Sequence, residues 1–249
     1  MPPRRRTPSQ VLFAILATAL VATAGAAYAR AGTEQAATTQ AGRLEGNVLL
    51  SSRIAQRRSR FRLYTEYGQN AAPPGPAGST NELGNVVIYL DSAIADAEVP
   101  AGSWRVRQVN EGFAPHVLAV PAGATVEFPN EDPFFHNVFS LSKTRTFDLG
   151  RFAQRTVKSI QFDRPGIVQI FCHIHSDMSA VVLVAPSRFY ATPDSTGAYS
   201  IDGIPPGRYR VVAWHERAKP TASTVEINPA RPARLDFNIP ISDAAPAVR

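Results

Sequence analysis

The hydrophobic pattern of this chain predicts short strands. Residues 104–109 (WRVRQV) and 156–162 alternate between apolar and polar positions, with the period of two that a half-buried strand shows. Residues 86–90 (VVIYL), 167–171 (IVQIF) and 180–184 (AVVLV) are continuous apolar runs, typical of strands that are buried on both faces. No long stretch shows the 3.6-residue period of an amphipathic helix. The pattern therefore predicts an all-β protein with many turns.

Turn sequences divide these strands into two groups. Pro-Ala-Gly at 121–123 and Arg-Pro-Gly at 164–166 separate strands of the first group, whose spacing of about 8–12 residues is typical of a β-sandwich or barrel. We expect this first domain at residues 84–186. A second, smaller β-sandwich is expected at 187–241, and a flexible tail at 242–249.

The region before the first domain, residues 30–83, has a mixed composition. It contains a predicted strand at 43–50, followed by a segment from Arg53 to Arg62 in which five arginines are spread. Residues 68–80 (GQNAAPPGPAGST) are rich in proline, glycine and alanine, which is typical of a linker or a long loop.

Residues 1–29 have the features of an export signal. The three arginines at 4–6 form a positive start, residues 11–27 are apolar, and Ala-Tyr-Ala at 27–29 is a small-x-small cleavage site. The sequence therefore predicts a periplasmic or secreted protein that is cleaved near Ala29. An uncleaved segment would instead anchor the protein to a membrane, although it is short of the ~20 residues of a span.

Composition and charge narrow the function. The chain has 249 residues, of which 44% are hydrophobic and 18% charged, so it is not a disordered chain. Removing the signal takes away three arginines and no acids, which lowers the net charge from +6 to about +3. Without a recognisable nucleic-acid motif, this charge does not indicate nucleic-acid binding. The single cysteine, Cys172, can form no intramolecular disulfide and needs burial or a ligand in an oxidising compartment.

Four residues carry candidate metal chemistry: His136, Cys172, His175 and Met178. In QIFCHIHSDMSA the thiol, imidazole and thioether follow at three-residue steps, so one tight loop can aim all three inward. A further equatorial ligand must come from elsewhere, and His136 in PNEDPFFHNVFS is the candidate. Structural zinc sites use four strong ligands, whereas two imidazoles, a thiolate and a weak axial thioether are the blue-copper set. We therefore expect one type 1 copper ion.

The segment from about 86 to 184 resembles a cupredoxin, a Greek-key β-sandwich that carries electrons. Its Cys-x-x-His-x-x-Met loop has the short spacing seen in amicyanin, and His-Asn-Val at 136–138 resembles the first-ligand motif of that group. The order of its motifs is also similar to the periplasmic cupredoxin-like proteins labelled methylamine utilisation proteins. The resemblance implies that Asn137 ties the ligand loops together and that His175 is the ligand near the surface.

The roles of the three other histidines differ. His173 directly follows Cys172, and adjacent side chains of an extended backbone point to opposite faces, so we expect it behind the ligands or directed outward. His116, in FAPHVL, is either an extra ligand near the copper or a structural residue. His215 lies in the second sandwich and is expected to be structural.

The C-terminal segment, residues 187–240, resembles the carboxypeptidase regulatory-like, or transthyretin-like, β-sandwich. The string DSTGAYSIDGIPPGRYRVVAWH carries this resemblance. The resemblance implies no catalytic residues and leaves open whether the module docks a partner or stabilises its neighbour. The arginines from Arg53 to Arg62 could steer an acidic redox partner, although a solvated face explains them as well.

Together these features predict a one-electron carrier with a redox protein as its partner. We expect no enzymatic activity, because a type 1 centre is coordinatively closed and the sequence offers no second metal set or acid–base pair. Two other classes stay open. One is a copper chaperone or resistance protein that holds Cu(I) with the help of His116, and the other is a cell-surface or carbohydrate-binding β module without metal.

Overall fold

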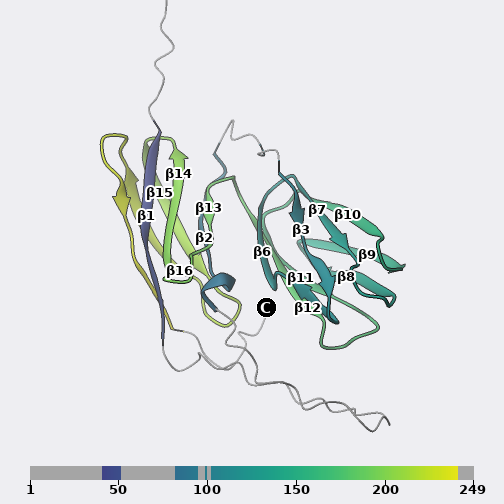
Figure 1. The fold of residues 1–249 in the computed structure, drawn as a ribbon. Coiled ribbons are helices and arrows are strands. Elements are labelled where there is room, and N and C mark those ends of the chain that lie inside the picture. Colours follow the sequence, from purple (N-terminus) through teal and green to yellow (C-terminus); the bar gives the residue numbers. More distant parts are fainter. Residues whose placement is uncertain (1–40, 52–81, 95–98, 100–101, 241–249) are drawn as a thin grey trace, which may run out of the picture. The chain divides into compact units, whose positions relative to one another are not determined.

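The structure, a computed structural model, describes residues 41–51, 82–94, 99 and 102–240. Four predicted segments lie outside these residues: 1–29, 53–62, 68–80 and 242–249. The described part consists of strands and one short 3₁₀ helix, η3 (Glu82–Asn85), which confirms the predicted all-β class (Figure 1). Among these residues, none forms a helix with the length and apolar character that crossing a membrane requires.

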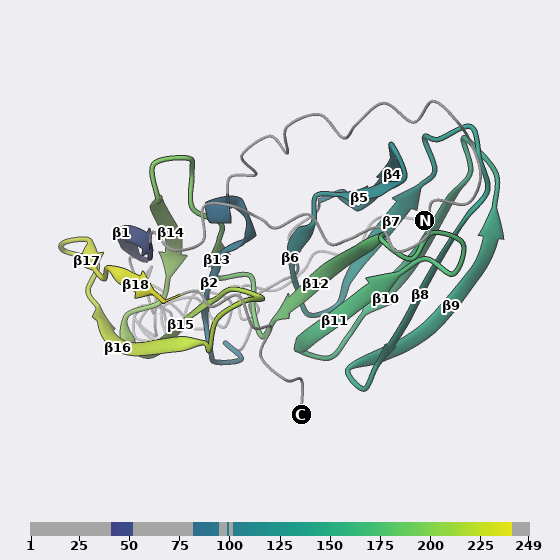
Figure 2. The same cartoon turned by 90° about the horizontal axis from the view of Figure 1, so that it is seen from below.

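One β-sandwich contains the segments that carry the predicted metal ligands. Its larger sheet has the order β6 (Val117–Pro121), β12 (Ser179–Ala185), β11 (Gly166–Phe171), β8 (His136–Ser142) and β9 (Arg145–Phe152) (Figure 2). Its smaller sheet has the order β10 (Val157–Phe162), β7 (Ala124–Pro129) and β3 (Trp104–Arg105). Phe128 and Phe162 from the smaller sheet share one buried core with Val138 and Ile170 from the larger sheet. A hairpin of β4 (Arg107–Val109) and β5 (Gly112–Ala114) completes this part.

A second sandwich also has two sheets. One contains β14 (Ala198–Ile204), β1 (Gly42–Leu50), β17 (Ala233–Arg234) and β18 (Phe237–Ile239). The other has the order β13 (Tyr190–Ala191), β2 (Val87–Leu90), β15 (Gly207–Trp214) and β16 (Thr221–Ile227). Their buried residues, from Leu44 on β1 to Ile239 on β18, form a core of their own.

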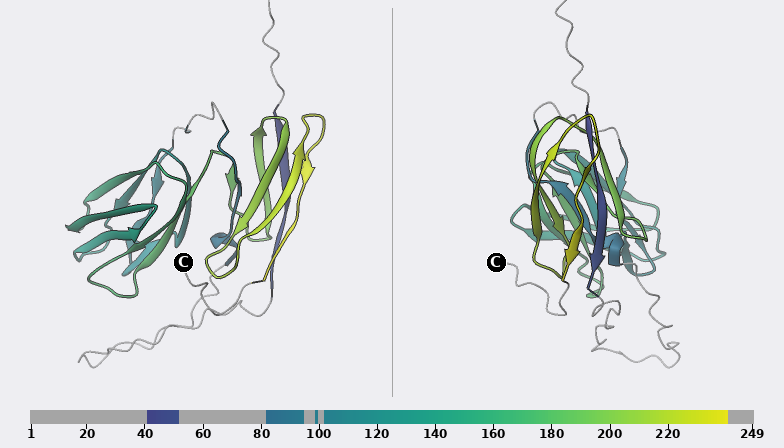
Figure 3. Two further views of the ribbon diagram at one scale, coloured as in Figure 1. Left: turned by 180° about the vertical axis from the view of Figure 1, so that it is seen from behind. Right: turned by 90° about the vertical axis from the view of Figure 1, so that its left-hand side faces the viewer.

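Two strands from before residue 187 belong to the second sandwich: β1, which was expected in the N-terminal region 30–83, and β2, which was expected in the first domain. This corrects the predicted division at residues 84 and 187. The strand β1 pairs antiparallel with β14 and parallel with β17 and β18. The strand β2 was expected to open the cupredoxin-like domain, but it pairs with β13 and β15. Figures 1 and 3 show the purple β1 among the green and yellow strands of residues 190–240. Three separate parts of the chain therefore build the second sandwich.

The burial of β2 explains why its sequence was misleading. Ile88 and Leu90 point into the core of the second sandwich, whereas Val87 belongs to a separate cluster with Leu183 of β12 and Trp214 of β15. Both faces of the strand are thus buried, which demands the continuous apolar run VVIYL. Such a run shows that a strand is buried, but it does not show which sheet contains it.

The position of β1 can be tested at Gly46. This residue lies opposite Tyr199 of β14, and a Cβ atom there would sit 1.9 Å from the backbone oxygen of Leu235. We expect Gly46→Ala to reduce the free energy of unfolding by about 1–3 kcal/mol, because the backbone must shift to admit the methyl group. Gly84→Ala is the matched control, because a Cβ atom at Gly84 meets nothing within 4 Å. Urea unfolding measures both, and equal midpoints for the two variants would contradict the placement of β1.

Candidate metal centre

Three predicted ligands come together in the first sandwich. His136 opens β8, Cys172 follows the last residue of β11, and His175 lies in the loop that leads to β12. The nitrogen of each imidazole and the Sγ atom of Cys172 lie within 4.8 Å of one another. The two imidazole rings meet edge to face, with their centroids 4.9 Å apart. Antiparallel pairing of β11 with β8, with Phe171 opposite Phe139, brings the two segments side by side.

The hydrogen-bonding state of the two imidazoles shows whether they fit a metal. The Nδ1 atoms of His136 and His175 are both buried, and neither has a hydrogen-bond partner. A buried polar atom without a partner is costly, and most such atoms in proteins are paired. A metal ion between the rings would take both lone pairs together with the Cys172 thiolate. This donor set fits copper, because two imidazoles, a thiolate and a weak axial thioether are the ligands of blue-copper sites.

Burial differs among the predicted ligands. His136 is fully buried and Cys172 is 6% exposed, whereas His175 is partly exposed. Met178 is 1% exposed and shares the core cluster of Cys172. Its N–H donates to the backbone oxygen of His175 at 3.2 Å, which closes the loop as a turn. The axial role of Met178 stays a prediction.

Asn137 links the two ligand segments. Its Oδ1 atom accepts a hydrogen bond from the His173 N–H at 3.2 Å, and its Nδ2 donates to Asp148 Oδ1 at 2.7 Å. The loop that carries Cys172 and His175 is thereby tied to β8 and β9. The His173 ring itself stacks on Phe139, with centroids 3.8 Å apart, so it lies outside the ligand group.

Asp132 contacts a predicted ligand but was not predicted from the sequence. Its Oδ2 atom accepts a hydrogen bond from His136 Nε2 at 2.9 Å, and it is 5% exposed. Burial alone would raise the pKa of Asp132, but hydrogen bonds from the Glu111 N–H, from His136 and from the Asn110 N–H hold this pKa below its usual value. An acid four residues before a candidate ligand histidine was the available signal, in the string PNEDPFFH.

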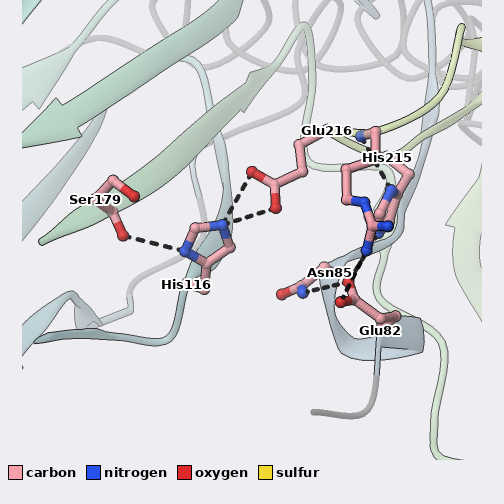
Figure 4. A network of polar contacts seen from close by, with 7 residues as sticks. Glu82, Asn85, His116, Ser179, His215 and Glu216 are labelled. Carbon is pink, nitrogen blue, oxygen red and sulfur yellow. Dashed lines mark hydrogen bonds and ion pairs between the residues drawn. The ribbon is translucent and has the colours of Figure 1, made fainter. Parts of the chain in front are cut away.

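The other two histidines, His116 and His215, form polar contacts of their own (Figure 4). His116 contacts the backbone oxygen of Ser179 through Nδ1 at 3.1 Å and the Glu216 carboxylate through Nε2 at 2.9 Å. Since both of its ring nitrogens are engaged, the structure favours a structural role for His116 over that of an extra ligand.

His215 is buried in the second sandwich. Its Nε2 contacts Glu82 at 3.3 Å, and its Nδ1 accepts the Arg217 N–H at 3.1 Å. Burial lowers the pKa of His215 below its ordinary value of 6.5, and Glu82 offsets this shift only in part. Folding therefore favours the neutral form of this ring.

A comparison with known protein families supports the prediction for the C-terminal segment. Residues 178–240 match the family model described as the carboxypeptidase regulatory-like domain, which confirms the resemblance predicted for the C-terminal segment. A search of curated proteins gave no match.

Solved copper proteins are similar over part of the chain. A purple cupredoxin from Nitrosopumilus maritimus is 19% identical over 33% of this chain and 100% of its own, with a TM-score of 0.31. An amicyanin mutant in its Cu(I) form is 23% identical over 40% of this chain and 98% of its own, with a TM-score of 0.32. A copper-containing nitrite reductase from Thermus scotoductus SA-01 is 28% identical over 38% of this chain and 26% of its own, also at 0.32. Each of these likenesses covers less than half of this chain.

Alanine substitutions of the histidines should separate ligands from other residues. Loss of a residue that only supports a ligand costs about 10–100-fold in metal affinity, and loss of a ligand should cost more. We therefore expect His136→Ala and His175→Ala to weaken copper binding by ~100-fold or more. His173→Ala, in the same loop, should bind like the wild type because its ring stacks on Phe139. Competition with a chromophoric chelator measures all three, and a wild-type affinity for either ligand variant would contradict the assignment.

The buried state of His215 predicts how stability depends on pH. Its pKa is lower in the folded than in the unfolded protein, so the unfolded state takes up a proton first as the pH falls. The contribution of His215 to the free energy of unfolding should be fully present above about pH 6.5. Below that pH it should decrease by up to about 1.4 kcal/mol per pH unit. His215→Asn should remove that part of the slope in urea titrations of metal-free protein, whereas His173→Asn, at an exposed position, should not. Identical slopes for the wild type and His215→Asn would show that the prediction is wrong.

Proposed function

We propose that this protein is an exported carrier of single electrons that holds one type 1 copper ion. His136, Cys172 and His175 would be its equatorial ligands, and Met178 its weak axial ligand. The observation that carries the proposal is the group of three donor atoms within 4.8 Å, in which both histidine Nδ1 atoms are buried and unpaired. Export rests on the composition of residues 1–29 alone.

Each ligand residue has a distinct part in this proposal. Bound copper would supply a one-electron couple whose potential depends on the axial ligand and on the surroundings of the sulfur. Cys172 contributes a soft thiolate and is held against the core cluster of the first sandwich. Because His136 and Cys172 are attached to paired strands, their positions change little, which favours fast electron exchange between oxidation states.

The exposed edge of His175 is the proposed route for electrons. Exposed apolar residues precede the histidine ligands in the chain: Phe134 is 50% exposed, Phe135 60% and Ile174 39%. Contiguous exposed apolar patches mark docking surfaces, and in this proposal the three side chains form an apolar rim beside His175. A redox protein that covers this rim would bring its own centre close to His175 while excluding water. An acidic partner would suit the arginines between 53 and 62, which lie outside the described residues.

The alternatives differ from this proposal in what they require of the site. A Cu(I) chaperone with His116 as an extra ligand would need a free ring nitrogen on that residue, and both are hydrogen bonded. A binding module without metal would leave the two buried Nδ1 atoms unexplained. We propose a carrier rather than an enzyme because the described residues contain one such metal-ligating group, with no second one to pass electrons to a substrate.

Replacing the proposed thiolate ligand tests this function directly. The copper-loaded wild type should show the intense visible absorption of a copper–thiolate bond, and Cys172→Ser should lose it, because a hydroxyl is a hard and largely protonated donor. Met178→Leu is the matched control in the same loop. It should keep copper and colour but shift the reduction potential upward, because an axial donor to the oxidised ion is lost.

Optical spectra, EPR and redox titration of the three proteins decide between the possibilities. A Cys172→Ser protein as intensely coloured as the wild type would contradict the copper assignment. Stoichiometric binding of colourless Cu(I) that resists reoxidation would support the chaperone instead. No copper binding by the wild type would support a module without metal.

A further inference from the structure

The turn of the β4–β5 hairpin reaches the segment that carries His136. Asn110 and Glu111 form this two-residue turn, and their φ angles are 53° and 54°. Two-residue hairpin turns use this left-handed backbone, which residues other than glycine rarely adopt. The two N–H groups of the turn donate to Asp132, at 2.7 Å from Asn110 and 2.9 Å from Glu111. Both oxygens of the Asp132 carboxylate are therefore held by backbone groups.

The same carboxylate holds His136. The distance from His136 Nε2 to Asp132 Oδ2 is 2.9 Å, and the two residues are 0% and 5% exposed. An ionised carboxylate only accepts hydrogen bonds, so His136 carries its proton on Nε2. The lone pair of the ring is then on Nδ1, the buried atom without a partner. Asp132 thus keeps the proton of His136 on Nε2 and leaves the lone pair of Nδ1 available to a metal ion.

The backbone around Asp132 is fixed independently of His136. The Asp132 N–H donates to Asn130 Oδ1 at 3.0 Å, and Asn130 Nδ2 donates to the Phe134 oxygen at 2.7 Å. The Glu131 N–H donates to the backbone oxygen of Gln108 on β4 at 2.9 Å. The position of the carboxylate therefore does not depend on its contact with His136 alone.

We propose that Asp132 is a positioning residue for the copper site, which fixes the tautomer and orientation of His136 and shifts the site toward Cu(II). The inference rests on the proposed function. A carboxylate that is hydrogen bonded to a ligand histidine fixes the ring and raises its basicity. Its negative charge also stabilises the doubly charged ion more than the singly charged one.

Asp132→Asn tests this role, with Asp163→Asn as the matched control. Both changes remove one carboxylate charge from the first sandwich, but Asp163 is exposed and lies outside the segments that carry the proposed ligands. We expect Asp132→Asn to weaken Cu(II) binding by about 10–100-fold and Cu(I) binding by less. Each tenfold difference between the two losses raises the reduction potential by about 59 mV. Asp163→Asn should change the potential far less.

The Cu(I) and Cu(II) affinities together show whether Asp132 positions His136 or only stabilises the fold. A residue that only stabilises the loop would, when replaced, weaken Cu(I) and Cu(II) binding equally and leave the potential unchanged. That result, or equal shifts in Asp132→Asn and Asp163→Asn, would overturn the proposal. Asp132→Glu keeps the charge and should restore part of the potential.

The tautomer can be measured without copper or any variant. Nitrogen-15 NMR of the metal-free wild type should show His136 protonated on Nε2 and not on Nδ1. Protonation on Nδ1 would overturn the inference even if Asp132→Asn fails to fold. If the wild type binds no copper, the proposed function fails, and the spectrum still decides whether Asp132 sets the tautomer.

Discussion

The pairing of β11 with β8 is the constraint on which the candidate metal centre depends. Phe171 lies opposite Phe139, so Cys172 leaves β11 beside the residues with which β8 begins. The hydrogen bond from the His173 N–H to Asn137 holds this arrangement one residue further on. A slip of one residue would turn Val168 and Ile170 out of the core, so hydrophobic burial fixes the register that places the ligands.

Support for the site extends into the second sandwich. The strand β12, which follows the ligand loop, is buried on both faces: Val182 belongs to the core of the first sandwich, and Leu183 to the cluster that includes Trp214. His116 links the backbone oxygen of Ser179 to the carboxylate of Glu216 (Figure 4). The residue after Met178 is thus connected to the C-terminal segment through the His116 ring.

Local pattern and donor chemistry were enough to predict much of this protein. The runs at 167–171 and 180–184 correspond to β11 and β12, and the predicted ligands His136, Cys172 and His175 lie close together. The partners of β1 and β2 could not be predicted, because pairing between strands more than 100 residues apart leaves no local signal. Asp132 escaped notice for a similar reason: its role depends on the turn at residues 110–111, which meets it only in the folded chain.

The first coordination shell of copper is the central claim, and X-ray absorption of the copper-loaded wild type tests it most directly. The ligand arrangement predicts one sulfur and two imidazole nitrogens at short distance, with little change between the oxidised and reduced forms, because paired strands hold His136 and Cys172. A shell of nitrogen and oxygen alone, without sulfur, would contradict the account, because Cys172 would then not be a ligand.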